Sequence, residues 1–541
     1  MEATMMNVQL GTGTIFAHGE RIHARSKIGT FDGEKVEWRS YAETARRARK
    51  LAAALKACGV GANMRVATLC WNDFAHFEAY LAIPSMGAVL HTLNLRLHAD
   101  QLAFIMSDAG DTVLIADGAL LADAIDVVNN IDSLEHIVVT GVSDGLSELT
   151  KPWSIYENFI AAHDPITEFP VPDENAAAAC CYTSGTTGNP KGVIYSHRTI
   201  YLHSLASMAA NAFGLSERDR IMLLPPMFHA NAWGLPFSGW FAGSDFVLPG
   251  AHLKAPAVQR MIAETAPSFT ATVPTILNEL LRADALSPID MSSFRTIVCG
   301  GSAVAESLIV EVDERWAVPL IQGWGMTETS PLCVLSHPAA DTIGADAHRL
   351  QSKSGRPVAG VEVRILDDNG ERLSEDGIVV GRLQLRGPWI AGGYHGVGDV
   401  LTEDGWLDTG DAGTIDDRGY VQVTDRLKDL IKSGGEWISS AELENHIADL
   451  PGIDEAAVIA VPDERWEERP LAIVTSQTNV TPDWALLRGQ LTTHVARFWV
   501  PEYWAEVKNL PLTGVGKVDK LALREQVASG SIQYLRVDIL A

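Results

Sequence analysis

Short hydrophobic runs alternate with segments of helical periodicity between residues 62 and 140. The runs, which predict buried strands because they are apolar and short, cover residues 65–70, 112–116 and 136–140. Residues 73–86 and 119–128 instead repeat hydrophobic side chains every three or four positions, which predicts helices. Strands that alternate with helices indicate a layered α/β domain. A similar pair, a strand over 294–300 and a helix over 304–316, recurs further along.

The pattern changes after Gly355. Glycines and short β-type runs then predominate, which predicts a small, mostly antiparallel β-subdomain over residues 355–424. The next segment predicts helices at 441–450 and 483–496 and strands at 456–461 and 471–476. This mixture predicts a separate α+β domain of ~110 residues, a size at which domains fold independently. We therefore expect an N-terminal domain over 1–427 and a C-terminal lid domain over 428–541, with a hinge near Lys428.

Composition is that of a globular chain with several domains. The chain has 541 residues, of which 47% are hydrophobic and 20% charged, and a typical domain has ~100–200 residues. No stretch approaches the ~20 apolar residues that span a bilayer, and residues 1–10 lack the features of a secretory signal. The six cysteines form no CxxC pair and mostly lie in apolar runs, so we expect reduced thiols and a cytoplasmic protein.

The net charge restricts the partners of the chain. It is −26, from 42 basic and 68 acidic side chains, which disfavours nucleic acid or an anionic membrane as a general partner. Anionic small molecules remain possible ligands, because charges are screened over ~8 Å at physiological salt and a few local cations dominate a site.

A segment rich in glycine and hydroxyl side chains follows the strand-like run 176–182. It reads Thr183-Ser184-Gly185-Thr186-Thr187-Gly188-Asn189-Pro190-Lys191-Gly192 and is called the phosphate loop below. Glycines let backbone N–H groups approach an anion, the hydroxyls donate hydrogen bonds, and Lys191 supplies a positive charge. The alternative is a polar hairpin turn, but hairpin loops usually have only ~2–5 residues. The pattern GxxxxGK[ST] does not fit, because Pro190 stands in place of its second glycine and a strand, not a helix, is predicted over 193–197.

A set of short motifs resembles, in order, those of the adenylate-forming superfamily, which includes acyl-CoA synthetases, firefly-type luciferases and peptide-synthetase adenylation domains. The motifs are the phosphate loop and residues 226–229, 300–303, 323–328, 406–411, 425–429 and 516–517. The similarity spans essentially the whole chain. It implies an α/β N-terminal domain with a smaller, rotating C-terminal lid. It also implies an ATP-dependent acid–CoA ligase that forms an acyl-adenylate with release of pyrophosphate and then passes the acyl group to CoA.

The resemblance implies that several motifs bind the nucleotide. The phosphates of ATP would contact Thr183, Ser184, Gly185, Thr186, Thr187, Gly188 and Lys191. The adenine and its surroundings would be lined by Gly301, Ser302, Ala303, Gly323, Trp324, Gly325 and Met326. Asp411 would accept hydrogen bonds from the ribose hydroxyls, and Arg426 would bind ribose or phosphate. A structural ion pair between Asp411 and Arg426, and a core position for Trp324, are the alternatives.

Three motif residues are expected to act in the first step, in which a carboxylate attacks the α-phosphate. Negative charge accumulates there, so cations, a metal and hydrogen-bond donors are required. By resemblance, Glu328 would bind Mg²⁺, which prefers oxygen ligands, and the Thr327 hydroxyl would contact the α-phosphate. The alternative for Glu328 is a surface position at a turn. Lys517 would reach the substrate carboxylate and the α-phosphate in this step only.

The second step, thioester formation with CoA, is expected to use a rotated lid. Lys428 resembles the hinge residue of the family. The segment that lines the pantetheine tunnel after rotation would contain Lys432, Gly434, Gly435, Glu436 and Trp437. Glycines there would let the backbone pass close to a thin ligand, although an ordinary glycine turn is the alternative.

The residues 229–233 are expected beside the acyl site. His229 stands where amino-acid adenylation domains usually have an aspartate, so we expect an acid without an α-ammonium group. His229 either gates the carboxylate or is a packed histidine. The bulky Trp233 and Trp324, with Gly301 in the same pocket, favour a short or medium acyl tail. The chain is similar to bacterial medium-chain and 3-methylmercaptopropionate–CoA ligases.

Other functions within the superfamily stay open. They are a long-chain fatty acid or aryl acid–CoA ligase, a luciferase-like oxygenase, an adenylation module and a nucleotide sensor without catalysis. The expected partners are a carboxylic acid, ATP with Mg²⁺, and CoA, with no nucleic acid and no integral membrane association. A homodimer is expected only by analogy with relatives.

Overall fold

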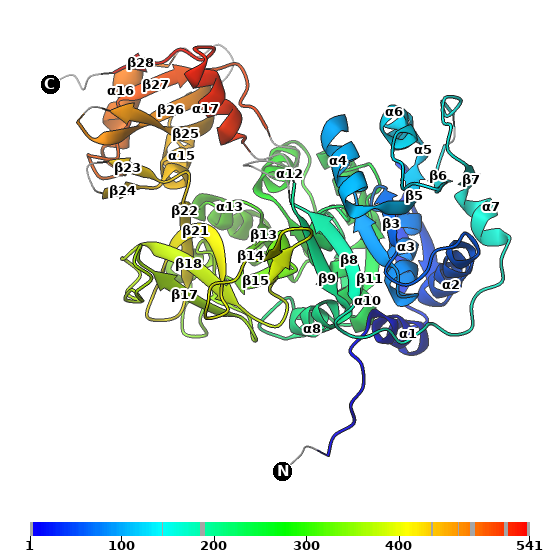
Figure 1. Ribbon diagram of the computed structural model, residues 1–541. Coiled ribbons are helices and arrows are strands. Elements are labelled where there is room, and N and C mark those ends of the chain that lie inside the picture. The colour runs from blue at the N-terminus through cyan, green and yellow to red at the C-terminus, as the bar shows by residue number, and fades with distance from the viewer. Residues whose placement is uncertain are drawn as a thin grey trace. The chain divides into compact units, whose positions relative to one another are not determined.

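The computed structural model of the chain describes residues 4–142, 144–183, 190–433, 436–463, 465–476, 482–512 and 518–537 (Figure 1). Packing of the backbone divides it into two compact units. The first contains the described residues up to Thr183, those from Pro190 to Glu362, and Arg386–Leu407. The second contains Val363–Leu385 and the described residues from Asp408 onward. The predicted β-subdomain over 355–424 is therefore shared between the units, and the predicted boundary near Lys428 stays a prediction.

The first unit contains two large sheets. Its nine-stranded sheet, as far as the chain is described, has the order β16 (Arg356–Pro357), β15 (Leu332–Leu335), β14 (Leu320–Gly325), β13 (Thr296–Gly300), β12 (Phe269–Thr272), β10 (Arg220–Met222), β11 (Asp245–Leu248), β1 (Lys27–Phe31) and β2 (Val36–Ser40). The central pairs are parallel, and β15, β16 and β2 pair antiparallel at the edges. Strands β12 and β13 at the centre of the sheet are buried along their whole length, as expected of parallel strands covered on both faces.

The second sheet of this unit has seven strands among the described residues. Their order is β7 (Trp153–Ile155), β6 (His136–Thr140), β5 (Asp111–Asp117), β3 (Arg65–Leu69), β4 (Val89–Thr92), β8 (Ala177–Tyr182) and β9 (Gly192–Ser196). Only β9 runs antiparallel to its neighbour, β8. The phosphate loop connects these two strands at an edge of the sheet. A short hairpin, β19 (Gly393–Tyr394) with β20 (Gly398–Asp399), also belongs to this unit.

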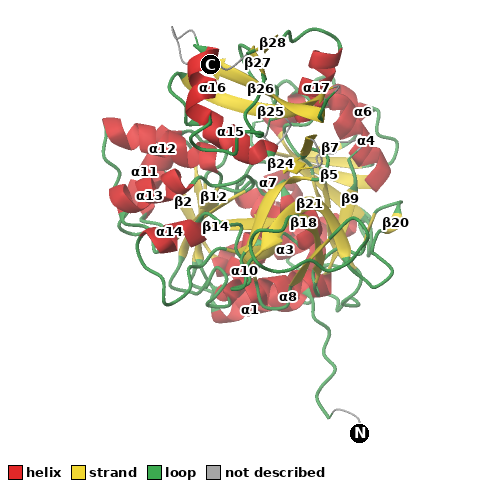
Figure 2. Ribbon diagram, turned by 90° about the vertical axis from the view of Figure 1, so that its left-hand side faces the viewer, coloured by secondary structure: helices red, strands yellow, loops and turns green. Residues whose placement is uncertain are grey.

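Helices cover and separate the two sheets. They are α1 (Thr12–Ile22), α2 (Tyr41–Ala57), α3 (Phe74–Ser85), α4 (Ala99–Ala109), α5 (Gly118–Ala122), α6 (Ile125–Asn129), α7 (Tyr156–Ala161), α8 (His197–Met208), α9 (Ala230–Trp233), α10 (Leu235–Ala242), α11 (Ala255–Thr265), α12 (Pro274–Leu286), α13 (Glu306–Trp316), α14 (Ala345–Gln351) and the 3₁₀ turn η1 (Thr327–Thr329). Figure 2 shows α11, α12 and α13 gathered on one flank. Helix α3 packs against β1 of one sheet and β3, β4 and β8 of the other, so it is buried on all sides.

The second unit contains a four-stranded sheet, in which β21 and β22 pair antiparallel, and a mixed sheet, within the described ranges. The first has the order β17 (Glu362–Leu366), β18 (Gly381–Arg386), β21 (Leu407–Ile415) and β22 (Val421–Arg426). The second has the order β24 (Glu436–Ile438), β23 (Ile431–Ser433), β26 (Glu467–Ser476), β27 (Tyr503–Glu506) and β28 (Leu535–Arg536), with β25 (Ile453–Asp463) paired to β26. Its helices are α15 (Ser440–Ala448), α16 (Trp484–Leu491) and α17 (Lys520–Ala528).

Two predicted helices differ from the observed ones. The segment predicted over 119–128 forms two short helices, α5 and α6, although its apolar side chains stay buried on one face. The helix predicted over 483–496 ends at Leu491, because the Thr492 and Thr493 hydroxyls donate to the carbonyls of Gly489 and Gln490 at 2.6 and 2.7 Å. Such local side-chain bonds compete with helix continuation.

Across the described ranges, no helix has both the length and the apolar character needed to cross a membrane.

Candidate active site

Strands β8 and β9 hold the two ends of the phosphate loop together. The Thr183 N–H donates to the Lys191 carbonyl at 2.9 Å, and the Lys191 N–H donates to Thr183 Oγ1 at 3.2 Å. The predicted phosphate ligands Ser184, Gly185, Thr186, Thr187 and Gly188 lie outside the described residues. The pairing of β8 with β9 nevertheless fixes where the loop starts and ends. It leaves Lys191 exposed at the edge of the sheet.

Lys191, Tyr394 and Glu328 form one cluster in the first unit. The Lys191 ammonium lies 5.0 Å from the centre of the Tyr394 ring, which is within the range of a cation–π interaction. The Tyr394 hydroxyl donates to Glu328 Oε1 at 2.6 Å. The backbone supports this arrangement, since His395 N–H donates to the Gly192 carbonyl at 2.8 Å. The predicted metal ligand and the predicted phosphate-binding lysine are thus joined by one tyrosine.

Sequence reasoning missed Tyr394. The segment Gly392-Gly393-Tyr394 carried a signal, because paired glycines beside an aromatic residue allow a close approach of backbone and ring. Glu328 is buried, so the predicted alternative of a surface glutamate is wrong. Its neighbour Thr327 is also buried, and the Thr327 carbonyl accepts a hydrogen bond from the Tyr195 hydroxyl at 2.7 Å.

The glycine-rich strand end before Glu328 is shaped by close backbone contacts. A Cβ atom at Gly325 would lie only 1.8 Å from the Pro331 carbonyl oxygen, so no other residue fits there. Trp324 is half-buried, so it is not a fully buried core tryptophan. Met326 precedes η1, and its N–H donates to Thr329 Oγ1 at 2.8 Å.

Strands β13 and β14 bring the residues of the predicted acyl pocket together. Gly300 pairs with Gly323, and a Cβ at Gly300 would lie 2.6 Å from the Gly323 carbonyl oxygen and 3.3 Å from Trp233 Cη2. The Trp233 ring therefore lies against the backbone of Gly300. The next three residues, Gly301, Ser302 and Ala303, are exposed beyond the strand end, where a ligand can contact them. His229 is half-buried and precedes the same turn as Trp233.

The second unit holds the remaining predicted residues. Asp411 on β21 lies opposite Arg426 on β22, and Arg426 Nε is 2.8 Å from Asp411 Oδ1. The ion pair that was the alternative interpretation is therefore present. The Asp411 carboxylate is buried, whereas nearly half of the Arg426 side chain is exposed (46%), so the guanidinium can also reach a ligand.

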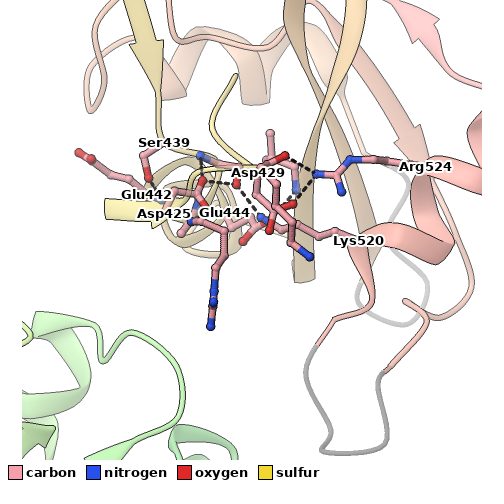
Figure 3. A network of polar contacts seen from close by, with 12 residues as sticks. Asp425, Asp429, Ser439, Glu442, Glu444, Lys520 and Arg524 are labelled. Atoms are coloured by element: carbon pink, nitrogen blue, oxygen red, sulfur yellow. Dashed lines mark hydrogen bonds and ion pairs between the residues drawn. The ribbon is translucent and has the colours of Figure 1, made fainter. Parts of the chain in front are cut away.

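A polar network fastens the predicted hinge segment to two helices (Figure 3). The Asp425 carboxylate accepts from the Ser440 N–H at 2.6 Å and from the Ser440 hydroxyl. Lys520, the first residue of α17, donates to Ser440 Oγ at 2.6 Å and lies 2.8 Å from Glu444 Oε1. Arg524 pairs with Asp429. Lys428 thus lies between Asp425, which is bound by a side chain of α15, and Asp429, which is bound by a side chain of α17.

The electrostatics of this network favour the charged form of Lys520. Burial alone would lower the pKa of its ammonium, but the nearby Glu444 and Asp425 outweigh that effect and raise the pKa above its usual value. Lys520 follows closely after Lys517, which lies outside the described residues. The network therefore anchors the start of α17, the described element nearest to Lys517 in the sequence.

Replacing Lys520 with methionine is expected to lower the free energy of unfolding by about 3 kcal/mol, because it leaves buried carboxylates without their cation. Urea unfolding followed by tryptophan fluorescence measures this loss. Lys520→Arg should retain most of the stability because it keeps the charge. The double variant Lys520→Met/Glu444→Leu should recover part of the loss, since both charges are then absent. A Lys520→Met protein as stable as the parent would contradict the assignment.

The segment predicted to line the pantetheine tunnel is described only in part. Lys432 lies on β23 with an exposed side chain, and its N–H donates to a Glu468 carboxylate oxygen at 2.8 Å. Gly434 and Gly435, and the side chains of Glu436 and Trp437, lie outside what the structure describes. Strands β23 and β24 pair antiparallel, with Ser433 opposite Glu436.

The first unit is an α/β unit in which Tyr394 links Lys191, at the end of a glycine-rich segment, to the buried Glu328. Residues 18–395 match the family described as AMP-binding enzyme, and residues 442–517 match the AMP-binding enzyme C-terminal domain. The chain belongs to this family. The predicted resemblance to adenylate-forming enzymes is confirmed.

Curated relatives are similar over nearly their whole length. The chain is 39% identical to 3-methylmercaptopropionyl-CoA ligase of Ruegeria pomeroyi, over 97% of this chain and 99% of the relative. It is 38% identical to medium-chain-fatty-acid–CoA ligase of Ectopseudomonas oleovorans, over 97% of both chains. It is 39% identical to long-chain-fatty-acid–CoA ligase of Thermus thermophilus, again over 97% of both.

Solved structures agree with this assignment. The anthranilate CoA ligase AuaEII in complex with anthranoyl-AMP has a TM-score of 0.86 at 25% identity, covering 98% of this chain and all of that one. ATP-bound MatB from Rhodopseudomonas palustris has a TM-score of 0.82 at 25% identity, covering 95% and 98%. The predicted α/β fold class is confirmed. The predicted enzyme class is also confirmed: the chain is an AMP-forming acyl-CoA synthetase that uses ATP, Mg²⁺ and CoA.

Proposed function

We propose that the acid is a short- or medium-chain fatty acid or 3-methylmercaptopropionate. The observation that carries this proposal is the Trp233 ring against the backbone of Gly300, which narrows the space beside the predicted acyl site. Two of the relatives most similar to the chain, named for 3-methylmercaptopropionate and for medium-chain fatty acids, support the same range. The relative named for long-chain fatty acids supports a longer acid as the second candidate.

In the first step, an oxygen of the substrate carboxylate attacks the α-phosphorus of ATP. The bond from that phosphorus to the bridging oxygen breaks, and pyrophosphate leaves with both electrons of that bond. The loop residues 183–188 and Lys191 would hold the phosphates, and the Thr327 hydroxyl would donate to the α-phosphate. Lys517 would lie between the carboxylate and the α-phosphate. Each of these donors stabilises negative charge that builds up in the transition state.

The donor set fits Mg²⁺. Glu328 offers a buried carboxylate whose Oε1 accepts a hydrogen bond from Tyr394. Within the described residues, no group of three or more His, Cys, Asp or Glu side chains could hold a metal by itself. Mg²⁺ in nucleotide sites is commonly held by only one or two carboxylates together with substrate phosphates. When bound, the ion would neutralise phosphate charge during the displacement. The role of Tyr394 is to hold the Glu328 carboxylate in one orientation.

Replacing Tyr394 with phenylalanine is expected to raise about 10-fold the Mg²⁺ concentration for half-maximal pyrophosphate release, since partners that orient a metal ligand affect affinity by roughly this factor. The phenylalanine keeps the ring beside Lys191 and removes only the hydroxyl bonded to Glu328. Tyr394→Leu, which removes the ring as well, should also raise the KM for ATP. An unchanged Mg²⁺ requirement in Tyr394→Phe would exclude this role.

The remaining nucleotide contacts are proposed from the family motifs. Trp324 would stack on adenine, beside Gly323, Gly325, Met326 and residues 301–303. Asp411 would bind the ribose hydroxyls, with Arg426 next to ribose or phosphate. The partial exposure of Trp324 and Arg426 supports these roles, because each keeps surface available for a ligand.

In the second step, the CoA sulfur attacks the acyl carbonyl carbon and AMP leaves with the oxygen that bound the acyl group. We expect the lid to rotate about Lys428 before this step, so that Lys432 and residues 434–437 line the path of the pantetheine arm. His229 would lie near the carboxylate in the first step. We likewise propose that the N-terminal domain ends at residue 427 and that the lid domain begins at Lys428.

Two properties of the whole protein are also proposed. A cytoplasmic location is supported by the six cysteines, all of which are free thiols. A homodimer is supported by exposed Met5, Met6 and Val8 in the N-terminal segment, which extends away from α1 in Figure 1 and offers apolar surface to a second subunit. Size-exclusion chromatography with light scattering distinguishes dimer from monomer.

The decisive experiment is pyrophosphate release measured over straight-chain acids of increasing length, 3-methylmercaptopropionate and aryl acids, with and without CoA. We expect the highest kcat/KM at short or medium length and formation of acyl-CoA with AMP. A maximum at long-chain or aryl acids would replace the proposed substrate. Light emission or oxygen uptake would instead support an oxygenase that uses the same adenylate.

A further inference from the structure

The segment between His229 and Leu235 contains a left-handed turn. Ala230, Asn231, Ala232 and Trp233 have φ values of 44°, 52°, 48° and 60°, and Gly234 follows at 73°. Hydrogen bonds from Ala232 N–H to the His229 carbonyl (3.0 Å) and from Gly234 N–H to the Asn231 carbonyl (2.9 Å) close it. L-residues other than glycine rarely adopt this conformation in succession, and asparagine tolerates it best. A turn of this kind persists only where its surroundings enforce it.

Buried side chains on two other elements hold Asn231. Its Oδ1 atom lies 3.2 Å from the Tyr80 hydroxyl on α3 and 3.4 Å from the Cys181 sulfur on β8. The Tyr80 hydroxyl also bonds the Met227 carbonyl just before the turn. All three side chains are buried, so water does not replace these bonds. Because β8 leads directly into the phosphate loop, the turn is tied to the strand that presents that loop.

The other end of the turn is fixed by packing. A Cβ at Gly234 would lie 2.4 Å from the ring of His203, which is itself buried and accepts the Leu332 N–H at 3.2 Å. The turn therefore has no room to shift toward α8. Between its two fixed ends it presents Trp233, whose ring lies against Gly300.

We propose that Asn231 and Tyr80 are positioning residues for substrate selection: they hold the left-handed turn that keeps the Trp233 ring against Gly300, and so they set the length of the carboxylic acid that the enzyme accepts. The inference rests on the proposed function, in that it takes Trp233 to border the acyl site. Neither side chain touches the reacting atoms. Their effect acts through the backbone conformation of the turn and the position of one indole ring.

The test compares Tyr80→Phe, Asn231→Ala and Asn231→Gly with the parent enzyme. Losing the Tyr80 hydroxyl, which bonds both Met227 and Asn231, is expected to raise the KM for the preferred acid about fivefold in Tyr80→Phe. Asn231→Ala should raise it further and broaden the chain-length profile, because alanine lacks the preference for positive φ. The KM of Asn231→Gly for the acid should lie between that of the parent and that of Asn231→Ala, because glycine adopts positive φ without strain. The KM for ATP should stay within about twofold in all three, because the proposed effect acts on the acid through the Trp233 ring alone.

A double-mutant cycle separates positioning from general destabilisation. In a Trp233→Leu background, Asn231→Ala and Tyr80→Phe should have no further effect on the chain-length profile, because they act through the indole ring. Tyr41→Phe is the matched control. Its hydroxyl is equally buried and bonds main-chain carbonyls, including that of Gly239 at 3.4 Å, but it does not contact the turn. It should leave the acid profile unchanged.

Several outcomes would overturn the inference. One is that Asn231→Ala or Tyr80→Phe changes the chain-length profile as much in the Trp233→Leu background as in the parent. Another is that the KM values for the acid and for ATP rise equally. The third is that Tyr80→Phe and Asn231→Gly have the same chain-length profile as the parent. If Asn231→Ala does not fold, these two milder variants decide the question. Failure of the parent enzyme to turn over any acid in the series would refute the proposed substrate instead, so the two failures are distinguishable.

Discussion

Lys517→Ala is expected to slow acyl-adenylate formation by ~10²–10³-fold, the usual cost of removing one preorganised donor to a transition state. The same variant should convert supplied acyl-adenylate and CoA to acyl-CoA at nearly the parent rate. The reason is that the lysine charge is proposed to serve only the step in which carboxylate and α-phosphate approach each other. In the second step the leaving group is AMP, and the lid is expected to have rotated.

The two half-reactions are measured separately. Pyrophosphate release without CoA reports the first, and acyl-CoA formation from synthetic acyl-adenylate reports the second. Lys508→Ala is the matched control, because Lys508 is an exposed lysine in the same part of the chain and should leave both rates unchanged. Equal losses of rate in both half-reactions would contradict the proposed role of Lys517 in the first step only. The start of α17 is anchored by the contacts of Lys520 with Glu444 and Ser440, which the Lys517→Ala variant keeps.

Lys428→Pro is expected to reduce thioester formation about 10²-fold, the scale of a misplaced catalytic group, while adenylate formation falls much less. Proline fixes φ near −65° and also restricts the preceding residue, so a hinge at this position could no longer rotate freely. In the described conformation, bonds from Arg524 to Asp429 and to the Lys428 carbonyl (3.4 Å) hold the segment in place.

Single-turnover measurement of each half-reaction checks this second prediction. Lys428→Ala is the control: it removes the ammonium but keeps the backbone torsion free, so its thioester formation should stay close to that of the parent. If Lys428→Pro forms thioester at the parent rate, the rotation does not occur at this residue. If Lys428→Ala is as slow as Lys428→Pro, the side-chain charge and not the backbone freedom is what matters.

Much of the fold could be predicted from the hydrophobic pattern. Strand β6 occupies the predicted residues 136–140, because a short apolar run between turn residues has few other stable structures. The helix after residue 483 was predicted too long, since the hydrogen bonds of Thr492 and Thr493 to the preceding carbonyls are invisible in an apolar periodicity. Helix α3 was located correctly, but its burial on all sides follows from two sheets packing against it.

The sequence by itself predicted the enzyme class, because its short motifs, among them the phosphate loop and the segment around Glu328, resemble in order those of adenylate-forming enzymes. The tertiary structure alone decided which side chains support them. Tyr394 reaches Glu328, and Tyr80 reaches Asn231, across long separations in the chain. The left-handed turn at Ala230–Trp233 is likewise a tertiary result, since local propensity opposes it and only the packing of Tyr80, Cys181 and His203 around it makes that conformation the most stable one.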